Sequence, residues 1–213
     1  MSFPLNLEDR VGLYVVTADH RGRTHVGMAK AAVSGGAGTI QYREKKASSR
    51  AMLETASRLR AITAAAGALL IINDRIDIAL AVNADGVHLG QDDMPCRAAR
   101  ELLGDGYIIG ISATNLSEAV EAAKDGADYI GLGPIYPTIS KDDAAPAMGI
   151  EGLEKVVSAV SVPVVAIGGL TADNIGGVVA AGAAGIATIS AIAGADDMEN
   201  EARRLSELIK RYK

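Results

Sequence analysis

The stretch AGTIQYREK, residues 37–45, indicates both how this chain folds and where a site could lie. It begins as an apolar strand and then places Gln41, Arg43 and Lys45 at alternate positions. Alternate residues of a strand share one face, so an amide, a guanidinium and an ammonium point the same way. That face is either exposed to solvent or part of a site that needs positive charge.

Similar short runs recur along the whole chain, and most are almost continuously apolar, which is typical of parallel strands buried on both faces. Between them lie segments rich in Ala, Glu, Lys and Arg with helical spacing, such as NLSEAVEAAKDG (115–126). Several helices are predicted to end in Gly or Asn followed by a small residue and the next strand. The eight expected strands are VGLYVVT (11–17), AGTIQYR (37–43), ALLIIND (68–74), DGVHLG (85–90), YIIGIS (107–112), ADYIGLG (127–133), PVVAIGG (163–169) and GIATISA (185–191).

About eight strands alternating with about eight helices in 213 residues predict an α/β fold, a single (β/α)8 barrel domain over residues 1–213. A doubly wound open sheet is the alternative. In a barrel the active site lies at the carboxyl ends of the strands. There, Gln41, Arg43 and Lys45 would form a cationic rim that suits phosphate oxygens.

Composition excludes several classes of protein. The formal net charge of −5 gives no general basic surface for nucleic acid or acidic membranes, so an anionic substrate needs a local cationic cluster. The single cysteine, Cys96, cannot form a disulfide framework and favours a reducing compartment. The first residues, MSFPLNLEDR, do not resemble a signal peptide. We therefore expect a soluble, cytoplasmic protein with no nucleic-acid or membrane partner.

Acidic residues follow two neighbouring predicted strands. Asn73 and Asp74 end the third strand, and Asp92 and Asp93 follow the fourth. Carboxylates there suit Mg²⁺, which takes one or two protein carboxylates and completes its shell with water and phosphate. Asn and Asp are also common in turns and helix caps, which is the alternative explanation. Because these acidic residues would lie next to the cationic rim, we favour a site that binds a metal together with a pyrophosphate over the turn-and-cap explanation.

A second anion site is indicated where the last two predicted strands, the seventh and the eighth, end. Gly168 and Gly169 end the seventh strand, where backbone N–H groups can approach a phosphate, and Ile189 and Ser190 hold the matching place on the eighth strand. Ser112, at the end of the fifth strand, either donates a hydrogen bond to a phosphate or caps the following helix.

The long irregular stretch 133–149 has the length of a binding loop, and its Thr138, Ser140 and Lys141 fit anion binding. His88 lies within a strand and is expected to be a core residue or one that supports the site.

Taken together, several ordered motifs resemble the thiamine-phosphate synthase family over nearly the whole chain. That family joins a pyrimidine-methyl pyrophosphate to a thiazole phosphate and releases pyrophosphate. The motifs are QYREK, INDR, DGVHLGQDD, GISATN, DYIGLGPIYPTISKDDAAP, VAIGGL and ISAI.

The resemblance implies a role for residues in each motif. Arg43, Lys45 and Lys141 would act on the departing pyrophosphate, and Asp74 and Asp93 would bind Mg²⁺ as the cofactor. The residues implied to bind the phosphorylated pyrimidine and thiazole substrates are Gln41, Tyr42, Arg43, Glu44, Lys45, Asn73, Ser112, Thr138, Ile139, Ser140, Lys141, Gly169, Ile189 and Ser190.

Two departures from the family pattern are visible: Ala113 and Thr114 follow Ser112 where the family often reads Ser-Thr-His, and Ile139 stands where a small polar residue is common. Two alternatives share this fold, a thiazole tautomerase and a non-catalytic barrel that binds a phosphorylated ligand. A homo-oligomer is compatible with the sequence.

Overall fold

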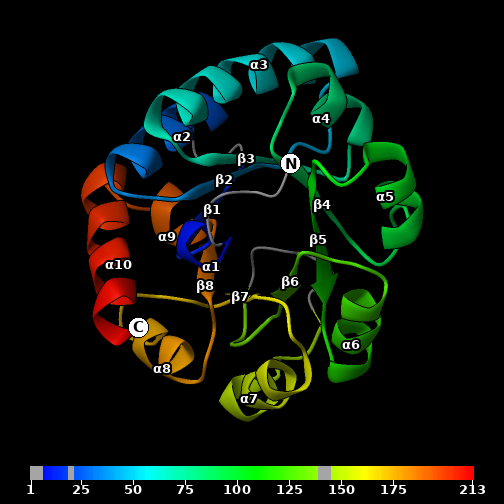
Figure 1. Ribbon diagram of the computed structural model, residues 1–213. Coiled ribbons are helices and arrows are strands. Elements are labelled where there is room, and N and C mark those ends of the chain that lie inside the picture. The colour runs from blue at the N-terminus through cyan, green and yellow to red at the C-terminus, as the bar shows by residue number, and fades with distance from the viewer. Residues whose placement is uncertain (1–6, 19–21, 139–144) are drawn as a thin grey trace.

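Eight parallel strands form a closed barrel in the computed structural model, which describes residues 7–18, 22–138 and 145–213 (Figure 1). Each strand pairs with its neighbours in sequence, and β1 closes the ring on β8, so the predicted (β/α)8 barrel is confirmed and the open sheet is excluded. The strands are β1 (Leu13–Thr17), β2 (Thr39–Tyr42), β3 (Leu69–Asn73), β4 (Gly86–Leu89), β5 (Ile108–Ala113), β6 (Tyr129–Leu132), β7 (Val164–Ile167) and β8 (Gly185–Thr188).

Helices surround the barrel and follow the strands in order (Figure 1). The short helix α1 lies across the amino-terminal opening, where Arg10 donates to the carbonyl of Gly67 and accepts from the Thr39 hydroxyl. No helix among the described residues is long and apolar enough to cross a membrane. The helices are α1 (Leu7–Arg10), α2 (His25–Ser34), α3 (Ser49–Ala66), α4 (Ile76–Val82), α5 (Cys96–Leu103), α6 (Leu116–Lys124), α7 (Gly149–Ala159), α8 (Ile175–Ala180), α9 (Ser190–Ala193) and α10 (Met198–Tyr212).

Two apolar clusters share the strands between them. The larger cluster lies between strands and helices and contains residues such as Ile40, Leu70 and Val87. The smaller one fills the barrel interior and includes Tyr14 and Tyr129. Because successive strand residues face opposite sides, every strand except β2 and β4 contributes to both clusters, which explains why most strands are continuous apolar runs in the sequence.

The expected Gly or Asn at the end of a helix is observed before each even-numbered strand. A residue of positive φ ends the turn before β2, β4, β6 and β8, in order Gly36, Asn83, Gly126 and Gly182. Such residues close a helix in the left-handed conformation. The strands differ from their expected bounds by a few residues, most of all at β8, which ends at Thr188. Ser190 opens α9 instead of continuing this strand.

Candidate active site

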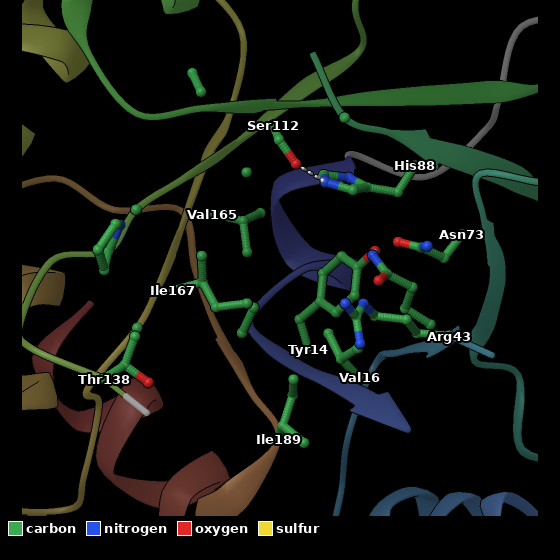
Figure 2. Close-up of a pocket in the computed structure, with 18 of the residues that line it drawn as sticks. Tyr14, Val16, Arg43, Asn73, His88, Ser112, Thr138, Val165, Ile167 and Ile189 are labelled. Carbon is green, nitrogen blue, oxygen red and sulfur yellow. Dashed lines mark hydrogen bonds between the residues drawn. The ribbon is translucent and has the colours of Figure 1, made fainter. Parts of the chain in front are cut away.

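A cavity of about 370 Å³ opens at the carboxyl ends of the strands. In Figure 2, Arg43, Asn73 and His88 lie on one side of the cavity, and the apolar side chains of Val165 and Ile167 lie on the other. The volume is that of a small-molecule site. A polar side facing an apolar side suits a ligand with both a charged group and a flat ring.

The side chains of Gln41, Arg43 and Lys45 all line this cavity, so the polar face of the opening sequence stretch is not simply solvent-exposed surface. Gln41 is buried at the end of β2, whereas Lys45 is largely exposed at the rim. Among the described residues, Arg43 has no hydrogen-bonded or ion-paired partner. The guanidinium is therefore available to an anionic ligand.

Tyr42 and Glu44 point away from the cavity and do not line it, so their implied part in substrate binding stays a prediction. Tyr42 is buried in the outer cluster, with its ring edge-on to His25 at 4.8 Å. Glu44 accepts from the amides of Lys46 and Ala47 and lies 3.3 Å from His25 Nε2. The alternation of strand residues is the reason, because neighbours of cavity-lining residues face outward.

The carboxylates of Asp74 and Asp93 face one another at the ends of β3 and β4, and both line the cavity. Burial, together with the hydrogen bond and negative charge of Asp93, raises the pKa of Asp74 to about 6, against the opposing influence of Lys45 and Arg43. Lys45 Nζ lies 3.9 Å from an Asp74 oxygen. A proton shared between the two carboxyls, or a cation between their oxygens, would relieve the repulsion within this pair.

Local structure fixes both carboxylates. Asp74 adopts φ 61°, a left-handed conformation that Asp tolerates better than most side chains. Asp93 accepts from the Gly90 amide at 2.7 Å, which folds the turn after β4 back toward the cavity. No cluster of three or more His, Cys, Asp or Glu suited to a metal exists among the described residues. Two carboxylates without a third ligand fit Mg²⁺, which keeps waters and takes phosphate oxygens.

The glycines after β7 lie at the opposite side of the cavity. Gly168 and Gly169 have φ 97° and 65°, and an added Cβ would come within 2.6 Å of Pro134 and of the Pro137 carbonyl, respectively. They therefore allow the segment after β6 to pack closely here as well as exposing backbone to a ligand. Helix α8 does not follow these glycines directly, since it begins at Ile175.

Further predicted residues lie in the same cavity. Asn73, Ser112, Thr138, Gly169, Ile189 and Ser190 all line it. Ile139, Ser140 and Lys141 lie outside the described residues. The structure thus brings together predicted residues from β2, β3, β5, β7, β8 and the segment after β6.

Several cavity residues were not predicted from the sequence. Tyr14, Val16, Val165 and Ile167 line the cavity floor and walls, and the sequence was interpreted there only as buried strand. The available signal was alternation: once a barrel is assumed, every second residue near a strand end faces the interior. Figure 2 also shows the contact of His88 with Ser112, in which Nε2 lies 2.9 Å from Oγ.

The family profile described as thiamine monophosphate synthase matches residues 13–192, which span every strand of the barrel. The chain belongs to the thiamine monophosphate synthase family. A thiamine-phosphate synthase of Archaeoglobus fulgidus is 54% identical over 207 residues, 97% of either chain. Another, from Chloroflexus aurantiacus, is 53% identical over 199 residues, 92% of either chain.

A solved structure shows the same arrangement. The thiamine phosphate pyrophosphorylase from Pyrococcus furiosus superposes with a TM-score of 0.91 at 44% identity, covering 97% of this chain and 99% of its own. Identity near one half over nearly the full length makes this member of the thiamine monophosphate synthase family an enzyme of the transferase class.

Proposed function

We propose that this enzyme couples 4-amino-2-methyl-5-(diphosphooxymethyl)pyrimidine with a thiazole phosphate. The C–O bond between the pyrimidine methylene and the diphosphate breaks, and a bond from that methylene to the thiazole nitrogen forms. The products are thiamine phosphate and pyrophosphate. The observation that carries the proposal is the placement of Arg43 and Lys45 beside the facing carboxylates of Asp74 and Asp93 in one cavity.

The diphosphate would lie at the cationic rim. Arg43 and Lys45 neutralise charge that grows on the leaving pyrophosphate, and groups placed in advance for such charge are often the largest contribution to catalysis. Asp74 and Asp93 would hold Mg²⁺, which, when bound, neutralises further phosphate charge. Lys141, Ser140 and Thr138 are proposed to act from the segment after β6, of which Thr138 lies in the cavity.

The heterocycles would occupy the centre of the cavity. Gln41, Asn73 and Ser112 offer amide and hydroxyl groups to the pyrimidine, and Val165 and Ile167 form an apolar wall beside the rings. An amino-substituted pyrimidine stabilises the cationic methylene left when the C–O bond breaks. The thiazole nitrogen is already a nucleophile, so alignment of the two rings is the main remaining requirement.

The thiazole phosphate is assigned to the loop after β7 and the start of α9, where Gly169, Ile189 and Ser190 line the cavity. This division leaves the reacting diphosphate at one end and the unchanged phosphate at the other. A cytoplasmic location is proposed from the single buried cysteine. Homo-oligomer formation stays a prediction.

Product analysis tests this function against its alternatives. The purified protein is incubated with both substrates and Mg²⁺, and thiamine phosphate and pyrophosphate are measured together. We expect equal amounts of the two products. Isomerisation of a thiazole carboxylate without coupling would identify a tautomerase, and ligand binding without turnover would identify a binding barrel.

A further inference from the structure

Five side chains form a continuous hydrogen-bonded chain across the barrel interior below the cavity. Gln41 Nε2 donates to Tyr14 Oη at 2.9 Å, and Tyr14 Oη lies 2.7 Å from Tyr129 Oη. Tyr129 Oη lies 2.9 Å from His88 Nδ1, and His88 Nε2 lies 2.9 Å from Ser112 Oγ. The chain begins and ends at two residues proposed to bind the pyrimidine.

The fold leaves space for this chain by placing glycines opposite its rings. A Cβ on Gly110 would lie 2.0 Å from Cζ of Tyr129, and a Cβ on Gly131 would lie 2.7 Å from Cε1 of His88. Neither ring could keep its position if those glycines had side chains. The chain is therefore built into strands β4, β5 and β6 rather than formed by flexible surface groups.

The hydrogens that these five side chains carry decide which group donates and which accepts in each bond. Burial raises the pKa of both Tyr14 and Tyr129, so both phenols keep their hydrogen. Tyr14 accepts from Gln41, and among the described residues Tyr129 is the one acceptor within reach of its hydrogen, so Tyr14 donates to Tyr129. Tyr129 then has His88 Nδ1 left as the acceptor for its own hydrogen. A neutral imidazole that accepts at Nδ1 carries its hydrogen at Nε2 and donates it to Ser112.

We propose that His88 is a positioning residue, held by Tyr129 as the Nε2–H tautomer, which makes Ser112 a hydrogen-bond donor into the cavity. The Ser112 oxygen already accepts from His88, so its hydroxyl hydrogen is directed to an acceptor atom of the bound ligand. On the proposed function, that acceptor is a ring nitrogen or phosphate oxygen of the pyrimidine substrate. Reversing the chain would require the amide oxygen of Gln41, instead of Nε2, to face Tyr14. Ser112 would then donate its hydrogen to His88 and could only accept a hydrogen bond from the ligand.

Histidine ¹⁵N NMR tests the tautomer directly, because protonated and unprotonated ring nitrogens give separate signals. The His88 signals are assigned by elimination with the variants His20→Asn and His25→Asn, which change the two histidines that are not among the five hydrogen-bonded residues. We expect Nε2 to carry the hydrogen in the unchanged protein. Hydrogen on Nδ1 would overturn the proposal.

Two isosteric variants test whether Tyr129 sets this state. Tyr129→Phe removes the donor to Nδ1, so the Nε2–H preference of His88 should be lost. Tyr14→Phe removes one hydroxyl from the same chain but leaves Tyr129 able to donate, and the tautomer should persist. An unchanged tautomer in Tyr129→Phe, or the same loss in Tyr14→Phe, would contradict the proposed direction.

Kinetics test whether the effect reaches the ligand through Ser112. Tyr129→Phe should lower kcat/KM for coupling about 2- to 10-fold in the otherwise unchanged enzyme, and less than about 2-fold when Ser112→Ala is already present. An equal loss in both backgrounds would show a merely structural role. This second test rests on the proposed function, whereas the NMR result does not, so the two can fail separately.

Discussion

At the scale of single residues, Asp74 combines a strained backbone with a functional position. Its φ of 61° lies where glycine is favoured, and its carboxylate faces that of Asp93. Residues held in such conformations cluster at functional sites. We therefore predict that Asp74 acts through its carboxylate and does not stabilise the fold.

Replacing Asp74 separates these two effects. Asp74→Gly should be more stable than Asp74→Ala by about 1 kcal/mol in urea unfolding without Mg²⁺, because alanine keeps the left-handed strain and glycine relieves it. Both variants should lose coupling activity. If the glycine variant is the less stable of the two, the backbone at Asp74 is not strained.

The proposed Mg²⁺ site has a control in the adjacent residue. Asp93→Asn should lower kcat/KM about 100-fold or more and raise the Mg²⁺ concentration needed for half-maximal rate. Asp92 also lines the cavity but is not assigned to the metal, and Asp92→Asn should keep the Mg²⁺ requirement unchanged. Activity that persists in chelator, or equal effects of the two variants, would remove the metal role from Asp93.

At the scale of elements, Glu44 joins the segment after β2 to the first turn of α2. Its carboxylate accepts from the Lys46 amide at 2.6 Å and contacts His25, whose Nδ1 lies 2.8 Å from the Thr17 hydroxyl. The Lys46 amide is the largest cause that lowers the pKa of Glu44 below its ordinary 4.5, and the Ala47 amide and His25 act in the same direction. Glu44 thus stabilises the fold in its charged form.

These interactions of the Glu44 carboxylate predict a pH dependence of stability. A carboxylate with a lowered folded pKa stabilises the protein above its unfolded pKa, and this contribution disappears as pH falls through the folded value. Glu44→Gln should therefore lower the free energy of unfolding by about 1 kcal/mol at pH 7, and by much less near pH 3. Urea unfolding at both pH values measures it.

The matched control for Glu44 is Glu54→Gln, on the exposed side of α3. That change should leave stability within about 0.5 kcal/mol at either pH. A constant loss in Glu44→Gln across the pH range would show that the charged carboxylate is not what stabilises the clamp.

Ser190 opens helix α9 at the edge of the cavity. We propose that it holds the thiazole phosphate, which does not change during the reaction. Ser190→Ala should chiefly raise the KM for thiazole phosphate, with a loss of about 0.5–3 kcal/mol for one hydrogen bond to a charged group, and leave kcat nearly unchanged. Steady-state kinetics decide it. A fall in kcat at unchanged KM would place Ser190 at the reacting centre.

At the scale of the whole molecule, the two ends of the barrel differ in purpose. At the amino-terminal end, Asp85 accepts from Arg60 and the Leu70 amide, and Asp128 accepts from Arg100 and the Ile109 amide. These repeated clamps join strands to helices. The carboxyl-terminal end instead carries exposed charges and strained residues, which is where function is expected in this fold.

The barrel itself could be predicted because each strand is a continuous apolar run with a helix between it and the next. The cationic rim could be predicted because Gln41, Arg43 and Lys45 repeat with the period of a strand. Tyr42 and Glu44 face outward, so a substrate-binding role for them is not supported by their position and stays a prediction. The chain from Tyr14 to His88 was missed because it joins residues distant in sequence.

We propose that coupling occurs at the mouth of the barrel, where Arg43 contacts the leaving pyrophosphate. The most direct measurement is kcat/KM for thiamine phosphate formation by Arg43→Gln, with thermal unfolding measured alongside. We expect kcat/KM to fall about 100-fold or more while the unfolding temperature stays unchanged. A rate within about twofold of the unchanged enzyme would contradict it, because one missing charge at a developing pyrophosphate cannot have so small an effect.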